Sequence, residues 1–147
     1  MSEHKVTVAW ERTTEDFVYE SYPRSHTWEF EGGHTVPASA APAYRGDPER
    51  VDPEEAFVAA LSSCHMLTFL ALAARKRLVV DRYRDEAVGY LEENAEGRLG
   101  MTRVVLRPQV TFREPPAPEA LERMHHQAHE HCFIANSVKT EVRVEPV

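Results

Sequence analysis

The chain has 147 residues, of which 42% are hydrophobic and 28% charged, and its net charge is −7. This is the length and composition of one globular domain, which can bury a core without metal or disulfide staples. The acidic balance argues against a nucleic-acid-binding protein and against docking on an anionic membrane surface. We therefore expect a single domain over residues 1–147.

No segment is expected to span a membrane or to direct secretion. The longest apolar stretch, residues 56–74, is interrupted by four polar side chains: Ser62, Ser63, His65 and Thr68. Residues 1–5 contain no apolar core of the kind found in a signal peptide. We therefore expect a cytoplasmic protein whose two cysteines, Cys64 and Cys132, stay reduced at rest.

The first third of the chain predicts short strands. Four segments have the composition of strands, namely residues 5–10, 17–19, 27–30 and 34–36. Gly32 and Gly33 predict a turn between the last two. The proline-containing stretch of residues 37–53 is typical of a loop.

A long helix is predicted from Asp52 to about Lys76. Asp52 can cap it, Pro53 suits the first helical position, and Glu55 lies three residues after the cap. The helix is apolar almost all round, which predicts burial on most of its sides. Cys64 lies near its middle.

The second half alternates between strand and helix patterns. Residues 79–91 and 101–112 predict a hairpin with its turn at residues 94–97. Residues 119–131 predict a second helix that leads to Cys132, and residues 138–144 predict a final strand. This order predicts the α+β class with mostly antiparallel sheet.

The two cysteines lie on two helices that are each predicted to pack inward. A lone cysteine in such a place is usually a small buried hydrophobe. Two of them can form a disulfide if their Cα atoms come within about 7 Å. From the residues alone it stays open whether Cys64 and Cys132 meet.

Residues 52–64, D-P-E-E-A-F-V-A-A-L-S-S-C, resemble the N-P-E-x-L-x-x-A-x-x-x-C signature of the OsmC/Ohr family, the osmotically inducible and organic hydroperoxide resistance proteins. Residues 128–132, A-H-E-H-C, resemble the family's second cysteine segment. The stretch from Arg24 to Gly33 matches in spacing the place of the family's active-site arginine. The resemblance covers nearly the whole chain. It implies an OsmC-like fold, with antiparallel sheets packed around two central helices in an intertwined homodimer.

The resemblance further implies a thiol peroxidase that reduces organic hydroperoxides without a metal or other cofactor. By position, Cys64 would be the peroxidatic thiol and Cys132 the resolving thiol, with Arg24 and Glu54 as the activating pair. A guanidinium stabilises a thiolate, and a carboxylate can hold that guanidinium. Cys64 would become a sulfenic acid and then a disulfide with Cys132, which an external dithiol would reduce.

The spacing of Glu54 and Cys64 adds an inference of its own. They lie ten residues apart on one predicted helix, which is about 15 Å of helical rise. One glutamate side chain cannot span that distance. If both residues serve one site, Glu54 must reach a cysteine of another chain, so we expect an interlocked homodimer with two interfacial sites.

The chain departs from the family pattern beside both cysteines. Phe133 follows Cys132 where proline is common, and it could change how Cys132 approaches Cys64. His65 follows Cys64 where an aromatic residue is frequent. His65 could act as a base near the sulfur, but about 100° of helical rotation separates the two, so we expect it to face elsewhere.

Three assignments stay open. Arg45, and after it Arg12, compete with Arg24 as the active-site arginine. His125 and His129 have an i, i+4 spacing that can bind zinc, although a polar helix face has the same pattern. An apolar pocket for an organic peroxide could be lined by five aromatic residues: Tyr22, Trp28, Tyr44, Phe57 and Phe133.

Other classes of function compete with the peroxidase. They are a non-enzymatic carrier of a small ligand or a redox sensor of the same fold, a metal-binding protein, and a thiol hydrolase with His65 or His129 as base. The coexistence of Arg24, Glu54 and two cysteines favours the peroxidase, because a carrier needs none of them.

Overall fold

The computed structural model describes residues 1–147, which form eight strands, two α-helices and two short 3-10 helices. The chain divides into two compact units, residues 1–56 and residues 57–147. The expected single domain over the whole chain stays a prediction.

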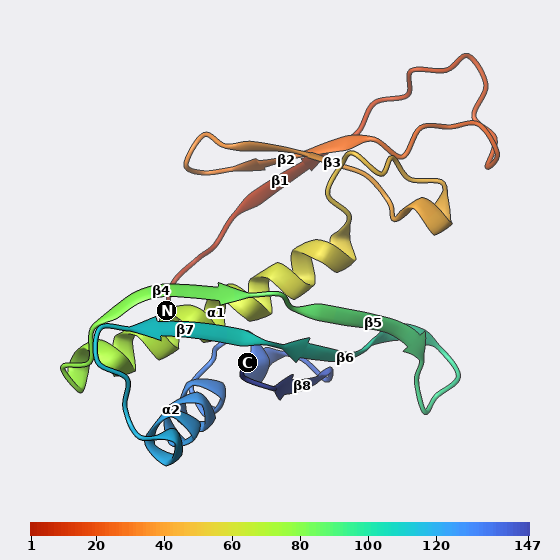
Figure 1. The fold of residues 1–147 in the computed structure, drawn as a ribbon. Helices are drawn as coiled ribbons and strands as arrows, with labels where there is room; N and C mark the ends of the chain where they lie inside the picture. Colours follow the sequence, from red (N-terminus) through yellow and green to blue (C-terminus); the bar gives the residue numbers. More distant parts are fainter. The chain divides into compact units, whose positions relative to one another are not determined.

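The first unit is built on a three-stranded antiparallel sheet in the order β1-β2-β3 (Figure 1). Its strands are β1 (Val6–Ala9), β2 (His26–Phe30) and β3 (Thr35–Ala38). The turn between β2 and β3 contains Gly33, whose φ of 83° favours glycine. Three of the four predicted strands and this turn are therefore confirmed.

The predicted strand at residues 17–19 is wrong. The backbone N–H groups of Ser21 and Tyr22 both donate to the carbonyl of Val18, at 3.1 Å. These bonds close a turn within the long connection between β1 and β2. Aromatic residues favour strands only where they pack against a neighbouring strand or a core, and this connection provides no such packing.

A tight loop follows β3 and contains the 3-10 helix η1 (Pro42–Tyr44). A Cβ atom on Gly46 would lie 1.5 Å from the carbonyl oxygen of Ala40, so only glycine fits this close approach. The next residue, Asp47, donates its backbone N–H to Ser39 Oγ at 3.0 Å. The loop is thereby fixed against Ser39 and Ala40.

The long helix α1 (Pro53–Arg75) begins at the predicted capping box. The Glu55 N–H donates to Asp52 Oδ1 at 2.8 Å, and the Asp52 N–H donates to Glu55 Oε2 at 3.2 Å. Two backbone donors that the first helical turn leaves free are thus satisfied. The prediction of this helix, from cap to last turn, is confirmed.

The second unit contains two small sheets. One pairs β4 (Val80–Asp85) with β7 (Pro108–Phe112), and the other has the order β5-β6-β8, formed by β5 (Val88–Glu93), β6 (Leu99–Leu106) and β8 (Glu141–Val144). All neighbours are antiparallel except β6 and β8, which are parallel. The mostly antiparallel α+β architecture is confirmed.

Each long strand of the predicted hairpin is divided in two. The first becomes β4 and β5, the second becomes β6 and β7, and the predicted turn joins β5 to β6. At the division, Asp85 Oδ1 accepts a hydrogen bond from the backbone N–H of Arg107 at 2.6 Å. In a continuous hairpin, the Arg107 N–H would donate to a backbone carbonyl group of the opposite strand. Because it donates to the Asp85 side chain instead, the backbone pairing is interrupted here and the strands divide between two sheets.

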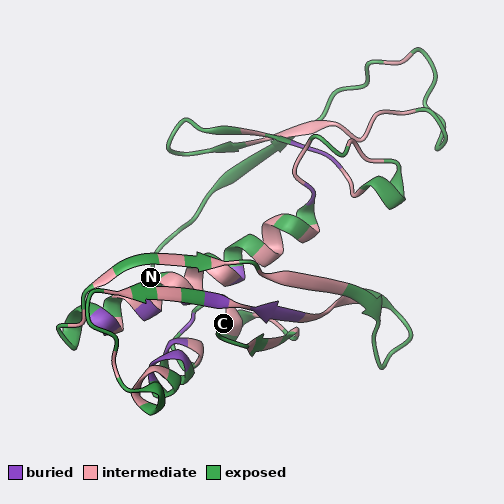
Figure 2. Cartoon of the chain, viewed as in Figure 1, coloured by how far each residue is buried: buried purple, intermediate pink, exposed green.

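Helix α2 (Pro118–Glu130) and α1 form the core together with these sheets (Figure 2). One cluster of buried side chains joins the two helices: Phe69, Ala73, Met124 and Ala128. A second cluster joins α1 to β6: Leu61, Val104 and Leu106. Helix α1 therefore contributes to both parts of the core, and α2 closely matches its predicted range.

The expectation that α1 is buried on most sides is wrong for the single chain. Only one face is buried, formed by Leu61, His65, Phe69 and Ala73, whereas Leu67 is 62% exposed. By length and composition α1 could also cross a membrane, with a mean hydropathy of 1.8 in its most apolar window. The central helix of a globular protein has the same properties, and the buried face of α1 packs on protein.

Candidate active site

The structure brings the two thiols together, a point that the sequence left open. Cys64 lies on α1 and is half-buried, while Cys132 follows the end of α2 and is only 1% exposed. Both are free thiols, and Cys64 lies close enough to Cys132 to raise the pKa of its thiol. Two sulfurs 68 positions apart in the sequence therefore form one pair in the second unit.

The environment of Cys132 keeps its proton in place. Burial is the largest cause, followed by the neighbouring Cys64 thiol, and together they raise the pKa of Cys132 to about 11. The Ala135 N–H donates to its sulfur at 3.4 Å and offsets only part of this shift. At neutral pH Cys132 is a thiol that can donate a hydrogen bond to the sulfur of Cys64.

Local hydrogen bonds fix the segments that carry the sulfurs. On α1, Ser62 Oγ donates to Asp85 Oδ2 of β4 at 2.5 Å. After Cys132 the chain turns into the 3-10 helix η2 (Ala135–Ser137), and the N–H of Asn136 donates to the Cys132 carbonyl at 3.0 Å. The segment of α1 that carries Cys64 and the turn that follows Cys132 are thus each held by a hydrogen bond near the thiol.

The two residues that follow the cysteines have opposite environments. His65 is buried, and its Nε2 lies 3.1 Å from Nδ1 of His125 on α2. Burial, and then His125 and His129, lower the pKa of His65 to about 4. His65 thus faces the interior, as expected, and is bonded to His125 rather than to a thiol. Phe133 is largely exposed.

Arg24 lines an apolar cavity of about 410 Å³ within the first unit. The cavity is formed by Val8, Trp10, Phe17, Tyr22, Arg24, His26, Ser39, Ala40 and Pro53. The guanidinium carbon lies 3.6 Å from the centre of the Tyr22 ring. Nη1 donates to the Tyr22 carbonyl, and Nη2 donates to the Tyr19 carbonyl at 2.6 Å. The head group is thereby oriented by its own neighbouring turn.

The competing arginines do not line this cavity. Arg12 donates to the carbonyls of Thr14 and Glu15. Arg45 lies 5.4 Å from the ring centre of Tyr19 and donates weakly to a carbonyl at 3.4 Å. Of the three candidates, only Arg24 combines a cation with apolar walls that could hold an organic ligand.

The expected ion pair between Arg24 and Glu54 is not formed in the single chain. The partners of the guanidinium are carbonyl oxygens and aromatic rings. Glu54 is half-buried in the first turn of α1, ten positions before Cys64. The local carbonyls compete for the same N–H groups, which sequence spacing does not reveal.

Of the five aromatic residues that could line a pocket for an organic peroxide, one lines the cavity beside Arg24. Tyr22 lines the arginine cavity, whereas Phe57 packs against the second unit's core. Trp10 and Phe17 take the places expected for other residues, and both rings contact Tyr22, with centres 6.2 Å and 5.0 Å away. The signal that could have found them is the density of aromatic residues just before Arg24.

No group of three His, Cys, Asp or Glu side chains is arranged to hold a metal ion. His125, one of the two histidines with zinc-like spacing, is buried and bonded to His65. The zinc alternative therefore has no support from the geometry.

Comparison with known proteins gives the family. The profile described as OsmC-like protein matches residues 46–147. An OsmC-like protein of unknown function from Vibrio cholerae is 54% identical over 100% of both chains, with a TM-score of 0.95. No functionally curated protein matches the sequence.

More distant structures share the fold. An organic hydroperoxide resistance protein from Elizabethkingia anophelis has a TM-score of 0.75 at 14% identity, over 99% of this chain and 94% of its own. The organic hydroperoxide resistance protein OhrB of Bacillus subtilis has a TM-score of 0.68 at 17% identity, over 99% and 98%. These neighbours confirm the predicted OsmC-like architecture. Because the family profile also covers well over half of its residues, the chain belongs to the OsmC/Ohr family of OsmC-like proteins.

Proposed function

We propose that this protein is a thiol-dependent peroxidase that reduces organic hydroperoxides to alcohols. The observation that carries the proposal is the proximity of two free thiols, Cys64 and Cys132, the first of which raises the pKa of the second. The pair is asymmetric, because Cys132 is buried and holds its proton while Cys64 is more accessible. A nucleophile must reach its substrate, so Cys64 is assigned as the peroxidatic thiol.

The reaction has two steps within the protein. The Cys64 thiolate attacks one peroxide oxygen, so that an S–O bond forms, the O–O bond breaks and the alkoxide leaves as an alcohol after taking up a proton. The Cys132 sulfur then attacks the Cys64 sulfenic acid, which forms the disulfide and releases water. An external dithiol restores both thiols by exchange and becomes a disulfide itself.

Arg24 is proposed to stabilise the thiolate and the charge on the departing oxygen. Two observations support this role. The guanidinium is already oriented by the Tyr22 ring, and the apolar walls of the cavity suit the organic part of a hydroperoxide. Glu54 is proposed as the carboxylate that pairs with this arginine when the site is complete. No metal or other cofactor is needed for these steps.

We further propose that the working protein is an intertwined homodimer. Helix α1 has the composition of a core helix, yet one of its faces is bare in the single chain, with Leu67 exposed. Exposed apolar faces of this kind mark interaction surfaces. A second copy would cover the face, and it could supply the Glu54 that one helix cannot bring to its own Cys64.

The proposed setting is the cytoplasm, where dithiol reductants are present and free thiols persist. Neither nucleic acid nor a membrane is proposed as a partner. Helix α1 makes specific polar contacts to protein, from Ser62 to Asp85 and from His65 to His125, which would be unusual for a helix surrounded by lipid.

The decisive experiment treats the reduced protein with one equivalent of cumene hydroperoxide and counts free thiols. The wild type should lose both thiols within minutes. A Cys132→Ser variant should accumulate a sulfenic acid at Cys64, and a Cys64→Ser variant should consume no peroxide. Hydrogen peroxide serves as the comparison substrate and should react more slowly if the apolar cavity contributes.

Three results would contradict the proposal. Wild-type protein that keeps both thiols would instead support a non-enzymatic carrier of the same fold. A Cys64→Ser variant with full activity would remove the mechanism. Oxidation of both thiols without continued turnover, when a dithiol such as dihydrolipoamide is supplied, would favour a redox sensor.

A further inference from the structure

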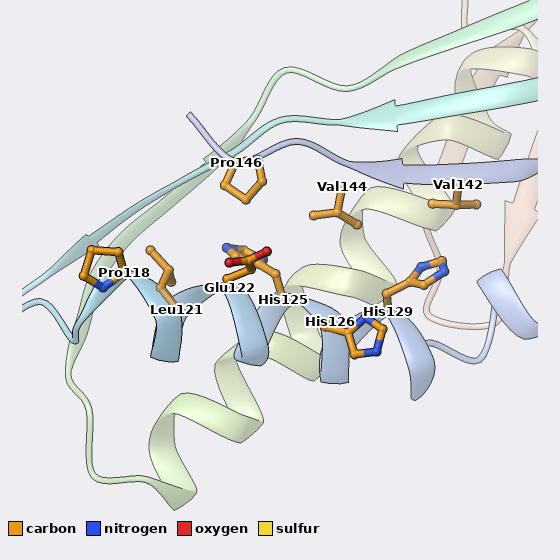
Figure 3. A pocket seen from close by; sticks show the side chains of 9 residues that line it. All are labelled: Pro118, Leu121, Glu122, His125, His126, His129, Val142, Val144 and Pro146. Carbon is orange, nitrogen blue, oxygen red and sulfur yellow. The ribbon is translucent and has the colours of Figure 1, made fainter.

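A second cavity, of about 460 Å³, lies between α2 and the C-terminal segment of the second unit, and neither cysteine lines it. Its walls are Pro118, Leu121, Glu122, His125, His126, His129, Val142, Val144 and Pro146. Figure 3 shows the apolar side chains of Val142, Val144 and Pro146 facing the histidines of α2. The volume is typical of a small-molecule site.

Two of the histidines that line this cavity have a buried nitrogen without a hydrogen-bond partner, Nδ1 in His129 and Nε2 in His125, and His125 is the more deeply buried of the two. The side chain of His125 is only 3% exposed, and its Nδ1 is bonded to Nε2 of His65. Its ring stacks on Phe69 at 4.4 Å between centres, so it cannot turn to find another contact. The remaining nitrogen, Nε2, has no hydrogen-bond partner. A buried polar atom of this kind is costly to leave unsatisfied.

The chemistry of the missing partner follows from the histidine pair. If the shared proton belongs to His65 Nε2, then His125 Nε2 carries its own proton and donates. If the shared proton belongs to His125 Nδ1, then His125 Nε2 is an acceptor. A hydroxyl group can both donate and accept, so it satisfies His125 Nε2 in either tautomer.

The charges around the cavity favour a neutral partner. Burial lowers the pKa of His125 to about 4, against an opposite effect of Asp85 on β4, so the ring is neutral at neutral pH. Glu122 on the rim adds a negative charge that repels carboxylates and phosphates. The apolar walls exclude strongly hydrated groups.

We propose that this cavity binds a small neutral alcohol or phenol. Its hydroxyl group would bond to His125 Nε2, and its hydrocarbon body would lie against Leu121, Val142 and Val144. The inference is independent of the peroxidase proposal, because it uses neither thiol and neither Arg24 nor Glu54.

The test uses the full chain in its native oligomeric state, with phenol as the probe. The histidine ring resonances are followed by NMR at pH 7.5 during a phenol titration. We expect a saturable shift of the His125 Nε2 resonance, because that nitrogen gains a hydrogen bond.

Two variants separate the hydrogen bond from the cavity. His125→Phe should weaken phenol binding by about fivefold or more, the effect of one lost hydrogen bond. Val144→Phe should block binding by filling the cavity while leaving the pair of His65 and His125 in place. Val79→Phe adds the same volume at an exposed valine outside the cavity, and it should bind phenol like the wild type.

The proposal is overturned if phenol leaves the His125 resonance unchanged up to its solubility limit. It is equally overturned if Val144→Phe binds as tightly as Val79→Phe, which would move the binding to another place such as the arginine cavity. A cavity closed by a second copy of the chain gives the first of these results. Loss of peroxidase activity in Cys64→Ser has no bearing on either outcome.

Discussion

The two units of the chain bury their aromatic side chains to different extents, although Phe133 of the second unit is exposed as well. In residues 57–147, Phe69 of α1 is fully buried against α2, in the same unit as the two thiols. In residues 1–56, Phe17 is 63% exposed and Trp10 is also exposed, around the cavity that Arg24 lines. The second unit therefore has a packed core around α1, whereas the apolar surface beside Arg24 in the first unit is open.

Core substitutions should show the largest difference between the units. Phe69→Ala removes a ring that is packed on Tyr83, Phe112 and His125, and it should lower the free energy of unfolding by about 3–5 kcal/mol. Phe17→Ala, the matched change in the first unit, should cost about 1 kcal/mol, since it loses only partly exposed aromatic contacts. Urea denaturation measures both. Equal losses would end the distinction between a packed and an open unit.

Lowering the pH should destabilise mainly the second unit. The pKa values of His65 and His125 are lowered to about 4 from 6.5, chiefly by burial, so the unfolded chain binds more protons between these values. Stability should therefore be fully present above pH 6.5 and fall as the pH drops toward 4, by on the order of 3 kcal/mol for each histidine. His129 and Asp85 face the pair and contribute to the shifts.

The denaturation midpoint, measured from pH 7.5 to pH 4, checks this dependence. A His125→Phe variant should lose much of it, whereas His34→Phe, at an exposed histidine of the first unit, should keep it. A flat profile in the wild type would show that the pair is charged or hydrated in the folded protein.

Substitutions of the arginines in the first unit should change the rate of peroxide consumption more than the stability of the protein. Arg24→Ala should slow peroxide consumption by about 100-fold, the effect of removing one oriented charge-stabilising group. Arg45→Ala is the matched control and should change it little, because Arg45 does not line the cavity. Stopped-flow peroxide consumption measures both rates. If Arg45→Ala has the larger effect, Arg24 is the wrong arginine.

The smallest expected effect lies where α1 begins. Asp52→Ala removes the acceptor of the Glu55 N–H and should cost about 1 kcal/mol. Asp81→Ala, at an exposed aspartate of β4, should stay within about 0.5 kcal/mol of the wild type. Thermal unfolding of the two variants compares them directly, and equal midpoints would mean that the cap contributes nothing.

Features that depend on neighbouring residues could be predicted from the sequence. The capping box located the start of α1, and the pattern of residues 119–131 located α2 to within one residue at each end. Gly33 located the turn between β2 and β3. Each of these is decided by backbone chemistry within a few positions, so a single sequence contains the required information.

Features that depend on distant residues could not be predicted in the same way. The bond from Arg107 to Asp85 that divides the long strands joins residues 22 positions apart, and the pair of His65 and His125 joins residues 60 apart. Nothing in the local pattern marks either partner. The candidate cysteines were identified from motifs, but their contact had to come from the fold.

The anchoring of Arg24 has a consequence for how this side chain can recognise an anion. Two of its N–H groups are engaged by the carbonyls of Tyr19 and Tyr22, and its face is engaged by the Tyr22 ring. A guanidinium has five N–H donors, so three are left over for an incoming oxygen, and little torsional freedom remains to be lost when it arrives. A lysine side chain has its three N–H donors on one nitrogen, so it could not bond both carbonyl groups and still present two donors to an incoming oxygen.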